Sequence, residues 1–412
     1  MWTGLSHCLW KTLWIRVMAL WNVRRRLWNA PSAPPAELGV GGSRPGGRVG
    51  VVRRAGAWQD QGVDDPTPEP APYADGPVAA LRRIAFLLER SRAESYKVKA
   101  YRSAAQTLLP LGEEVADRVE DGTLTDLPGI GPSTAKVVVA AVQGRVPDRL
   151  ATLEREVGGP LVEGGERVRA ALRGDLHSHS DWSDGGSPIE EMAFTAMELG
   201  HDYLVLTDHS PRLTVANGLS VARLTRQLGV VEAVNEHLGD DGFRLLKGIE
   251  VDILDDGSLD QTEEMLGRLD VRVASVHSKL AMDPEPMTRR MVAAVHNPFT
   301  NVLGHCTGRL VTGNRGKRKQ SEFDAEQVFG ACLETGTAVE INSRPERRDP
   351  PTKLLQLAID MGCLFSIDSD SHAPGQLDFL AYGCARAEEL GLEADRIVNT
   401  WPLDRLLEWA KP

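Results

Sequence analysis

The stretch GDLHSHSDWSDG (residues 174–185) places two histidines one residue apart and follows them with Asp184 in a turn that is bounded by glycines. Side chains at alternate positions of a strand point to the same face, so His177 and His179 can bind one metal ion together. Asp184, set back by the turn, can reach a second ion from the loop. A solvated pair of histidines is the alternative, but histidine is scarce, with 10 in 412 residues. We therefore predict a metal site at a strand end.

After this stretch, strand-like apolar runs end repeatedly in a histidine or a carboxylate, and helical segments lie between them. The runs are Tyr203–His209, Leu245–Glu250, Val271–His277, Asn301–His305, Ala338–Asn342 and Cys363–His372. Alternating strands and helices are typical of an α/β barrel, whose strands deliver their polar ends to the carboxyl-terminal face. The pattern therefore predicts a barrel with a site for several metal ions at that face.

From about residue 172 to its end, the chain resembles the polymerase and histidinol phosphatase (PHP) family of metal-dependent phosphoesterases. Residues able to coordinate fill all nine metal-binding positions of that family: His177, His179, Asp184, His209, Glu250, His277, His305, Asp370 and His372. The resemblance implies a distorted (β/α)7 TIM-like barrel. Asp184 stands at the third position, as in the version fused to bacterial family X DNA polymerases; the phosphatase branch more often has a histidine there.

The resemblance also sorts these ligands into three metal positions, with Glu250 as a bridge. The first has His177, His179, Glu250 and Asp370, the second Glu250, His277 and His305, and the third Asp184, His209 and His372. Imidazole and carboxylate without thiolate suit Mn²⁺, Zn²⁺ or Fe²⁺ better than Mg²⁺. Such ions activate water for attack on phosphorus. Glu250, Asp370 and His177 are therefore catalytic candidates.

Cations that follow strand ends are candidates for contact with phosphate, because acidic residues outnumber basic ones from residue 175 onward. Lys279 and Arg309 are the predicted catalytic cations. The loop 315–319 and three arginines after Asn342 are further candidates: Arg344, Arg347 and Arg348. Asp208 and Asp368 are expected to orient histidines or to cap strand ends.

Residues 1–76 differ in composition from the rest: five of the nine tryptophans lie within residues 1–28, followed by tracts of proline, glycine and arginine. We expect a disordered extension and a proline-rich linker. A targeting or membrane-surface helix is the alternative. No run here is long enough and sufficiently free of charge to span a bilayer, so no membrane partner is predicted.

Residues 77–170 predict a small all-helical domain that binds DNA. An amphipathic helix over residues 78–92 is followed by a second helix over residues 96–109. The second helix carries Lys97, Lys99 and Arg102 near its start, where they can face a phosphate backbone. A solvated basic face is the alternative interpretation.

The motif LPGIG at residues 127–131 opens a helix rich in alanine and valine. It resembles the helix-hairpin-helix, which binds the DNA backbone without regard to sequence, with Gly129, Ile130 and Gly131 as the hairpin and Lys136 as a supporting cation. Amides at the start of a helix can bind a phosphate oxygen, and glycines let the backbone approach it closely. Ile130 would also serve as an apolar plug of the hairpin.

Residues from about 79 to 144 resemble the amino-terminal DNA-binding domain of family X polymerases. Only about 30 residues separate Gly144 from the first metal motif, too few for a nucleotidyl-transfer palm. Templated synthesis is therefore not expected.

The predicted function is that of a metal-dependent phosphoesterase with three divalent ions, acting as a 3′-5′ exonuclease on DNA ends. A small-molecule phosphatase of the histidinol-phosphatase type is the alternative, and a noncatalytic DNA-binding protein is a third. The barrel is expected to keep its metal when it begins near Gly174. Five scattered cysteines without CxxC spacing indicate no disulfide framework, so a reducing cytoplasm is predicted.

Overall fold

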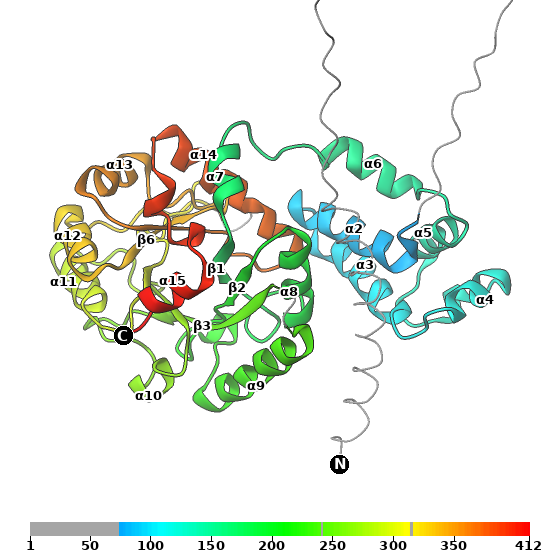
Figure 1. Cartoon of the computed structure of the whole chain (residues 1–412), viewed down its shortest axis with the longest axis horizontal. Coiled ribbons are helices and arrows are strands. Elements are labelled where there is room, and N and C mark those ends of the chain that lie inside the picture. The colour runs from blue at the N-terminus through cyan, green and yellow to red at the C-terminus, as the bar shows by residue number, and fades with distance from the viewer. Residues whose placement is uncertain (1–73, 240–241, 314–315) are drawn as a thin grey trace, which may run out of the picture.

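A computed structural model describes residues 74–239, 242–313 and 316–412. These residues form a helical domain and an α/β barrel that lie side by side (Figure 1). The tryptophan-rich extension and nearly all of the predicted linker, up to residue 73, lie outside the described residues, as does Arg315 of the predicted basic loop.

The helical domain is built around α2, which packs against α3, α5 and α6. Its elements are α2 (Gly76–Arg90), α3 (Ser95–Leu108), α4 (Glu114–Glu120), the 3-10 turn η1 (Leu124–Asp126), α5 (Pro132–Val142) and α6 (Asp148–Val157). Leu81, Ile84 and Leu88 recur at helical spacing along α2 and are buried in the domain's core. A separate hydrophobic core of its own makes this part a domain.

The barrel contains seven parallel strands in chain order, each paired with the next. They are β1 (Gly174–Ser178), β2 (Tyr203–Leu206), β3 (Arg244–Asp252), β4 (Val271–Ser275), β5 (Val302–Leu303), β6 (Ala338–Asn342) and β7 (Phe365–Asp368). Ser178 forms a bridge with Ser371, so the chain after β7 returns beside β1. The predicted TIM-like α/β barrel with an amino-terminal helical domain is therefore confirmed.

Helices surround the strands, as parallel sheets require. They are α8 (Ile189–Glu198), α9 (Val221–Leu238), α10 (Glu263–Leu266), α11 (Pro284–Val295), α12 (Ala325–Thr335), α13 (Thr352–Met361), α14 (Leu380–Glu389) and α15 (Leu403–Trp409). None of the helices in the described ranges is both long and apolar enough to cross a membrane.

One end of the barrel is closed by apolar packing. Tyr203, Val271 and Ala338 begin their strands and share a buried cluster with Trp401 and with Leu406 of α15. The cluster fills the amino-terminal end, so polar side chains are left to gather at the carboxyl ends of the strands.

The two domains meet along α2, which packs against the 3-10 segment η3 (Pro374–Phe379), just after β7. Figure 1 shows α2 and α3 on the side of the barrel that carries α8 and α14. The short helix α7 (Glu166–Ala171), predicted to end the helical domain, packs instead against α14 of the barrel.

Candidate metal centre

The nine predicted ligands come together at the carboxyl ends of the strands. His177 and Glu250 lie within β1 and β3, and the others follow strands directly: His179 and Asp184 after β1, His209 after β2, His277 after β4, His305 after β5, and Asp370 and His372 after β7. Parallel strands place these ends at one edge, which explains how positions almost 200 residues apart share one site.

Glu250 lies at the middle of this cluster and contacts imidazoles on all sides. Its Oε1 is 2.8 Å from His305 Nε2 and 3.2 Å from His277 Nε2. Its Oε2 is 2.9 Å from His209 Nδ1, 3.3 Å from His177 Nε2 and 3.5 Å from His179 Nε2. A carboxylate in this place would suit the bridging role that the resemblance implies.

Potential ligand atoms form three overlapping groups in the described residues, with the atoms of each group within 4.8 Å of one another. The floor group is His177, His179 and Asp370; the central group is His209, Glu250 and His277; the rim group is His179, Asp184, His209 and His372. All three members of the floor group are buried. In the rim group the side chains of Asp184 and His372 are 24% and 18% exposed.

This grouping resembles the expected partition and differs from it at four residues. His179 belongs to the rim group as well as to the floor group, and Glu250 belongs to the central group alone. His209, expected with Asp184 and His372 alone, also belongs to the central group. His305, expected as a ligand of the second ion, contacts Glu250 without joining a group. The assignment of each residue to an ion stays a prediction.

Buried nitrogen atoms without partners indicate that the site fits divalent ions. Among the described residues, Nε2 of His177 and both ring nitrogens of His179 are buried without a hydrogen-bond partner. Carboxylate oxygens of Glu250 and Asp370 lie 3.3 to 4.0 Å from the two Nε2 atoms. Two ligands bound to one ion at ~2.1 Å lie about 3 to 3.5 Å apart. Most of these spacings therefore suit a shared ion better than a direct hydrogen bond.

The imidazoles around Glu250 keep its carboxylate ionised. Burial raises the pKa of the Glu250 carboxyl, but the charges of His277, His177 and His209 outweigh burial and hold that pKa well below its ordinary value. Burial, together with His372 and His209, holds the pKa of His179 well below its ordinary value. Ionised carboxylate and neutral imidazole are the forms that bind metal.

Three carbonyl or carboxylate oxygens fix the orientation of three histidines. Nδ1 of His177 is 2.6 Å from Glu340 Oε1, and Nδ1 of His372 is 2.9 Å from the carbonyl oxygen of Asp370. Nδ1 of His277 contacts Asp252. For His177 and His277 the carboxylate contact places a proton on Nδ1 and leaves Nε2 free toward the cluster, as metal-binding histidines require. Nδ1 of His372 also lies 3.0 Å from Arg344 Nη1, which can donate to it.

Glu340 and Asp252 were missed by sequence reasoning. Glu340 is fully buried in β6, where it also accepts a hydrogen bond from the backbone amide of His305. A carboxylate between Val339 and Ile341 was the available signal, because a buried charge needs a partner.

Asp208 and Asp368 hold backbone and loops, which is the second of the two expected roles. Asp208 accepts hydrogen bonds from the amide and hydroxyl of Ser180, at 2.9 and 2.6 Å. Asp368 accepts from the amide of Leu176 and from Asn399 Nδ2. Neither contacts a histidine ring in these bonds.

Two arginines contact the floor group through Asp370. Arg347 Nε is 3.1 Å from Asp370 Oδ2, and Arg344 Nη1 is 3.6 Å from Asp370 Oδ1. Burial raises the pKa of Asp370, but Arg344 and Arg347 outweigh it and keep the pKa well below its ordinary value. These are the cations that the fold brings to the metal centre.

Lys279 and Arg309, the predicted catalytic cations, are directed elsewhere, and these predictions need correction. Lys279 Nζ pairs with Asp255 at 2.6 Å, and its side chain is 64% exposed. Arg309 donates to the carbonyl oxygens of Arg347 and Arg348. Arg309 therefore supports the segment that carries Arg347, while Lys279 is a surface cation.

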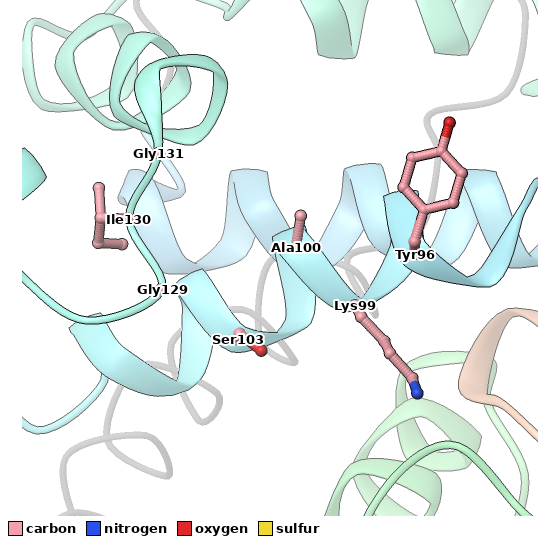
Figure 2. Close-up of a pocket in the computed structure, with 7 residues that line it drawn as sticks. All are labelled: Tyr96, Lys99, Ala100, Ser103, Gly129, Ile130 and Gly131. Atoms are coloured by element: carbon pink, nitrogen blue, oxygen red, sulfur yellow. The ribbon is translucent and has the colours of Figure 1, made fainter.

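The predicted hairpin borders an open pocket of about 440 Å³. Tyr96, Lys99, Ala100 and Ser103 of α3 line it together with residues 129–131 (Figure 2). Gly129 has a φ of +81°, a left-handed conformation that favours glycine. Lys136 is exposed on α5. The pocket is therefore wide and shallow, and it has a cation on one wall.

The amides of the hairpin are less free than the sequence suggested. The amide of Ile130 donates to Leu127 O, and that of Gly131 donates to Thr134 Oγ1. The side chain of Ile130 is buried in the domain core, which is the alternative role of an apolar plug. The amide of Gly129 and those in the first turn of α5 would be left to meet a phosphate.

Arg102 was predicted to contact DNA, and the structure contradicts this. It is buried, and its guanidinium donates two hydrogen bonds to Glu89, at 3.0 and 2.7 Å, and one to Glu191 of the barrel, at 3.0 Å. Lys97 is exposed and pairs with Glu94 at 2.9 Å. Arg102 belongs to the contact between the domains.

The comparisons with known proteins agree with this architecture. The profile of the PHP domain matches residues 175–344, and that of the helix-hairpin-helix domain matches residues 75–145. "DNA polymerase/3′-5′ exonuclease PolX" from Bacillus subtilis is 37% identical over 228 residues, which cover 55% of this chain and 39% of that protein. A probable phosphatase from Thermoanaerobacter sp. is 27% identical over 237 residues, 55% of this chain and 89% of that protein.

A solved structure also matches: histidinol phosphate phosphatase from Lactococcus lactis, complexed with zinc, L-histidinol and phosphate. It is 17% identical, has a TM-score of 0.38, and covers 54% of this chain and 95% of its own. The chain spans 39% of the length of the polymerase relative. The PHP profile and the phosphatase relatives support a hydrolase that acts on phosphoric ester bonds, as predicted. With both profiles matched, this chain carries a PHP domain, preceded by a helix-hairpin-helix domain on its amino-terminal side.

Proposed function

We propose that this protein is a metal-dependent phosphodiesterase that removes nucleotides from DNA ends, in the 3′-to-5′ direction. The observation that carries the proposal is the packing of a helix-hairpin-helix domain directly against a barrel with a cluster of metal-binding residues. A DNA-backbone binder beside a phosphoesterase site has a use only if the ester belongs to a nucleic acid. The cysteines among the described residues are buried and unpaired, which fits a reducing compartment such as the cytoplasm.

The floor, central and rim groups would hold three divalent ions, with Mn²⁺ or Zn²⁺ favoured and Fe²⁺ as a third choice. When bound, such ions lower the pKa of a coordinated water and neutralise charge on phosphoryl oxygens. Glu250 orients the imidazoles around it, and Glu340 keeps Nε2 of His177 directed into the cluster.

Arg344 and Arg347 take the role that we had expected of Lys279 and Arg309. Their side chains are 22% and 15% exposed, enough to meet a phosphate while they stay paired with Asp370. A guanidinium matches the geometry of two phosphate oxygens and loses little freedom when it binds. They would hold the scissile phosphate in place over the floor group.

Binding of the DNA would depend on the hairpin pocket. Lys99 supplies charge, Tyr96 is 64% exposed and offers a face for stacking, and the first turn of α5 offers amides to phosphate. Contacts of this kind do not distinguish bases, so the enzyme would act on ends of any sequence.

The alternative is a small-molecule phosphatase of the histidinol-phosphatase type, which the names of several relatives favour. The two functions are separated by giving the Mn²⁺-loaded protein two substrates in parallel: an oligonucleotide labelled at its 5′ end and histidinol phosphate. We expect a ladder of shortened, 5′-labelled products and slow phosphate release. An oligonucleotide labelled at its 3′ end should lose its label at once.

Rapid phosphate release from histidinol phosphate, with the oligonucleotide intact, would contradict the nuclease proposal and support the alternative. The Glu250→Ala protein serves as the control for contaminating nucleases, because it should be inactive on both substrates.

A further inference from the structure

The contact between α2 and η3 is so close that only glycine fits at its centre. A Cβ atom added to Gly375 would lie 2.2 Å from the carbonyl oxygen of Phe86 and 2.9 Å from the amide of Arg90. Both are backbone atoms of α2, which cannot swing aside as a flexible side chain could. The loop after β7 is therefore seated directly on the helical domain.

A buried network of charges stabilises this contact between α2 and η3. Glu89 of α2 accepts two hydrogen bonds from Arg102 and a third, at 2.7 Å, from the amide of Gly375. Arg102 also binds Glu191 of α8, which pairs with Arg82 at 3.1 Å. Buried ion pairs with several directed bonds fix one geometry, because a shifted arrangement leaves a charge without its partner.

The network lies three residues from a metal-binding residue. The amide of His372 donates to the side chain of Gln376 within η3, at 2.8 Å. The carbonyl oxygen of His372 accepts from the amide of Gly186, at 2.7 Å, and so joins the turn that carries Asp184. Arg90 adds a contact with Asp378 at the far end of η3. Contacts therefore lead from α2 to both loop-borne members of the rim group.

We propose that the helical domain is a structural part of the rim metal site. Glu89 and Gly375 act as positioning residues: they fix η3, which sets the place of His372 and, through Gly186, of Asp184. The inference deepens the proposed function and rests on its metal centre. It also replaces the expectation that the barrel keeps all its metal when it begins near Gly174.

The rim group needs such support more than the floor group does. Asp184 and His372 lie on loops beyond the strands, whereas His177 lies within β1 and is held by Glu340. Residues that orient ligands from outside typically account for a factor of about 10 to 100 in metal affinity. Loss of the support should therefore weaken binding of the rim ion alone.

The test uses the full chain and Mn²⁺ as the probe. Equilibrium dialysis against Mn²⁺ gives the number and affinity of bound ions for two variants. Glu89→Gln removes the charge that Arg102 and Gly375 need. Gly375→Ala forces η3 away from α2. His372→Ala is measured in parallel, because the binding step that it abolishes identifies the rim ion.

We expect Glu89→Gln and Gly375→Ala to weaken that same step about 10-fold or more and to leave the tighter steps unchanged. Two matched controls should bind Mn²⁺ as the unaltered protein does. Arg83 lies on α2, as Glu89 does, and Arg83→Ala breaks an exposed pair with Glu154 of α6. Gly229→Ala adds a methyl group where nothing lies within 4 Å.

Unchanged Mn²⁺ binding in both variants would overturn the inference. Equal weakening of every step would also overturn it, because it would indicate a general loss of structure. Circular dichroism establishes the fold of each variant; if Gly375→Ala does not fold, Glu89→Gln decides alone. The dialysis contains no DNA, so its result can be interpreted even if the nuclease proposal fails. If the unaltered protein binds no Mn²⁺, the metal centre itself is contradicted.

Discussion

The floor and the rim of the metal centre are built by different means. The floor group is fully buried, and His177 within it is fixed by strand β1 and the neighbouring Glu340. In the rim group, Asp184 and His372 stand on loops, and one of those loops rests on another domain. The comparison suggests that the barrel alone specifies the floor, while the rim depends on how the chain is assembled. Variants of the floor and of the rim test that difference.

The largest effect is expected at the residue that serves both parts. Glu250→Ala removes a carboxylate that lies within 3.5 Å of five imidazoles, so it should reduce hydrolysis to background and lower the metal content. Elemental analysis and the labelled-oligonucleotide assay check this. Binding of DNA by Glu250→Ala in a gel-shift assay should persist. Glu232→Ala serves as the control: it removes an exposed ion pair with Lys247 and should behave as the unaltered protein does. If Glu250→Ala keeps its metal and its activity, Glu250 is not the central residue of the metal centre.

The next prediction compares one carboxylate of the floor with one of the rim. Asp370→Ala should lower kcat by several orders of magnitude, since it removes a floor ligand and the partner of two arginines. Asp184→Ala should cost less, because the ions of the floor and central groups would remain. Steady-state kinetics at saturating Mn²⁺ measures both. Equal losses in the two variants would show that floor and rim act as one unit.

A smaller effect is expected from the cations beside the floor. Arg347→Ala should lower kcat about 100-fold, the usual effect of a lost charge-stabilising donor. Lys279→Ala should change it by less than about twofold, because exposed ion pairs such as the one with Asp255 contribute little. Metal content should stay unchanged in both. A larger loss with Lys279 than with Arg347 would restore the sequence-based assignment.

The smallest effect on chemistry is expected farthest from the metals. Gly131 has open space around it and ordinary backbone geometry, so Gly131→Val should fold and partly fill the hairpin pocket. KM for DNA should rise about tenfold, or ~1.4 kcal/mol, with kcat and Mn²⁺ binding unchanged. A small phosphodiester such as bis(p-nitrophenyl) phosphate should be hydrolysed as before. A parallel loss on that substrate would show that the hairpin affects the metal centre directly.

The barrel and its cluster could be predicted because the signals are local. Most apolar runs end in a ligand, as with His277 after β4 and His305 after β5, and parallel strands bring such ends together without further information. The hairpin could be predicted for a similar reason. Two glycines directly before a helix allow a tight turn, and Gly129 has the left-handed φ that the turn requires.

What the sequence could not specify depends on pairs formed across long distances. Arg102 and Glu191 are 89 positions apart, so nothing near Arg102 in sequence indicates that a barrel residue neutralises it. Lys279 stands two residues after a ligand, yet its backbone has a left-handed φ of 50° and its side chain pairs with Asp255. Glu340 had a readable signal, a carboxylate amid apolar residues, but its partner His177 lies 163 positions away.

The fit of Gly375 against α2 also has a meaning for related chains. A side chain at this position excludes the contact, and a neutral residue at either Glu89 or Arg102 leaves a buried charge behind. The three positions should therefore change together: chains that share this assembly should keep all three, and chains in which another domain separates the helices from the barrel should be free to lose them. An alignment of related chains, sorted by domain order, would then identify this domain arrangement from the glycine at position 375.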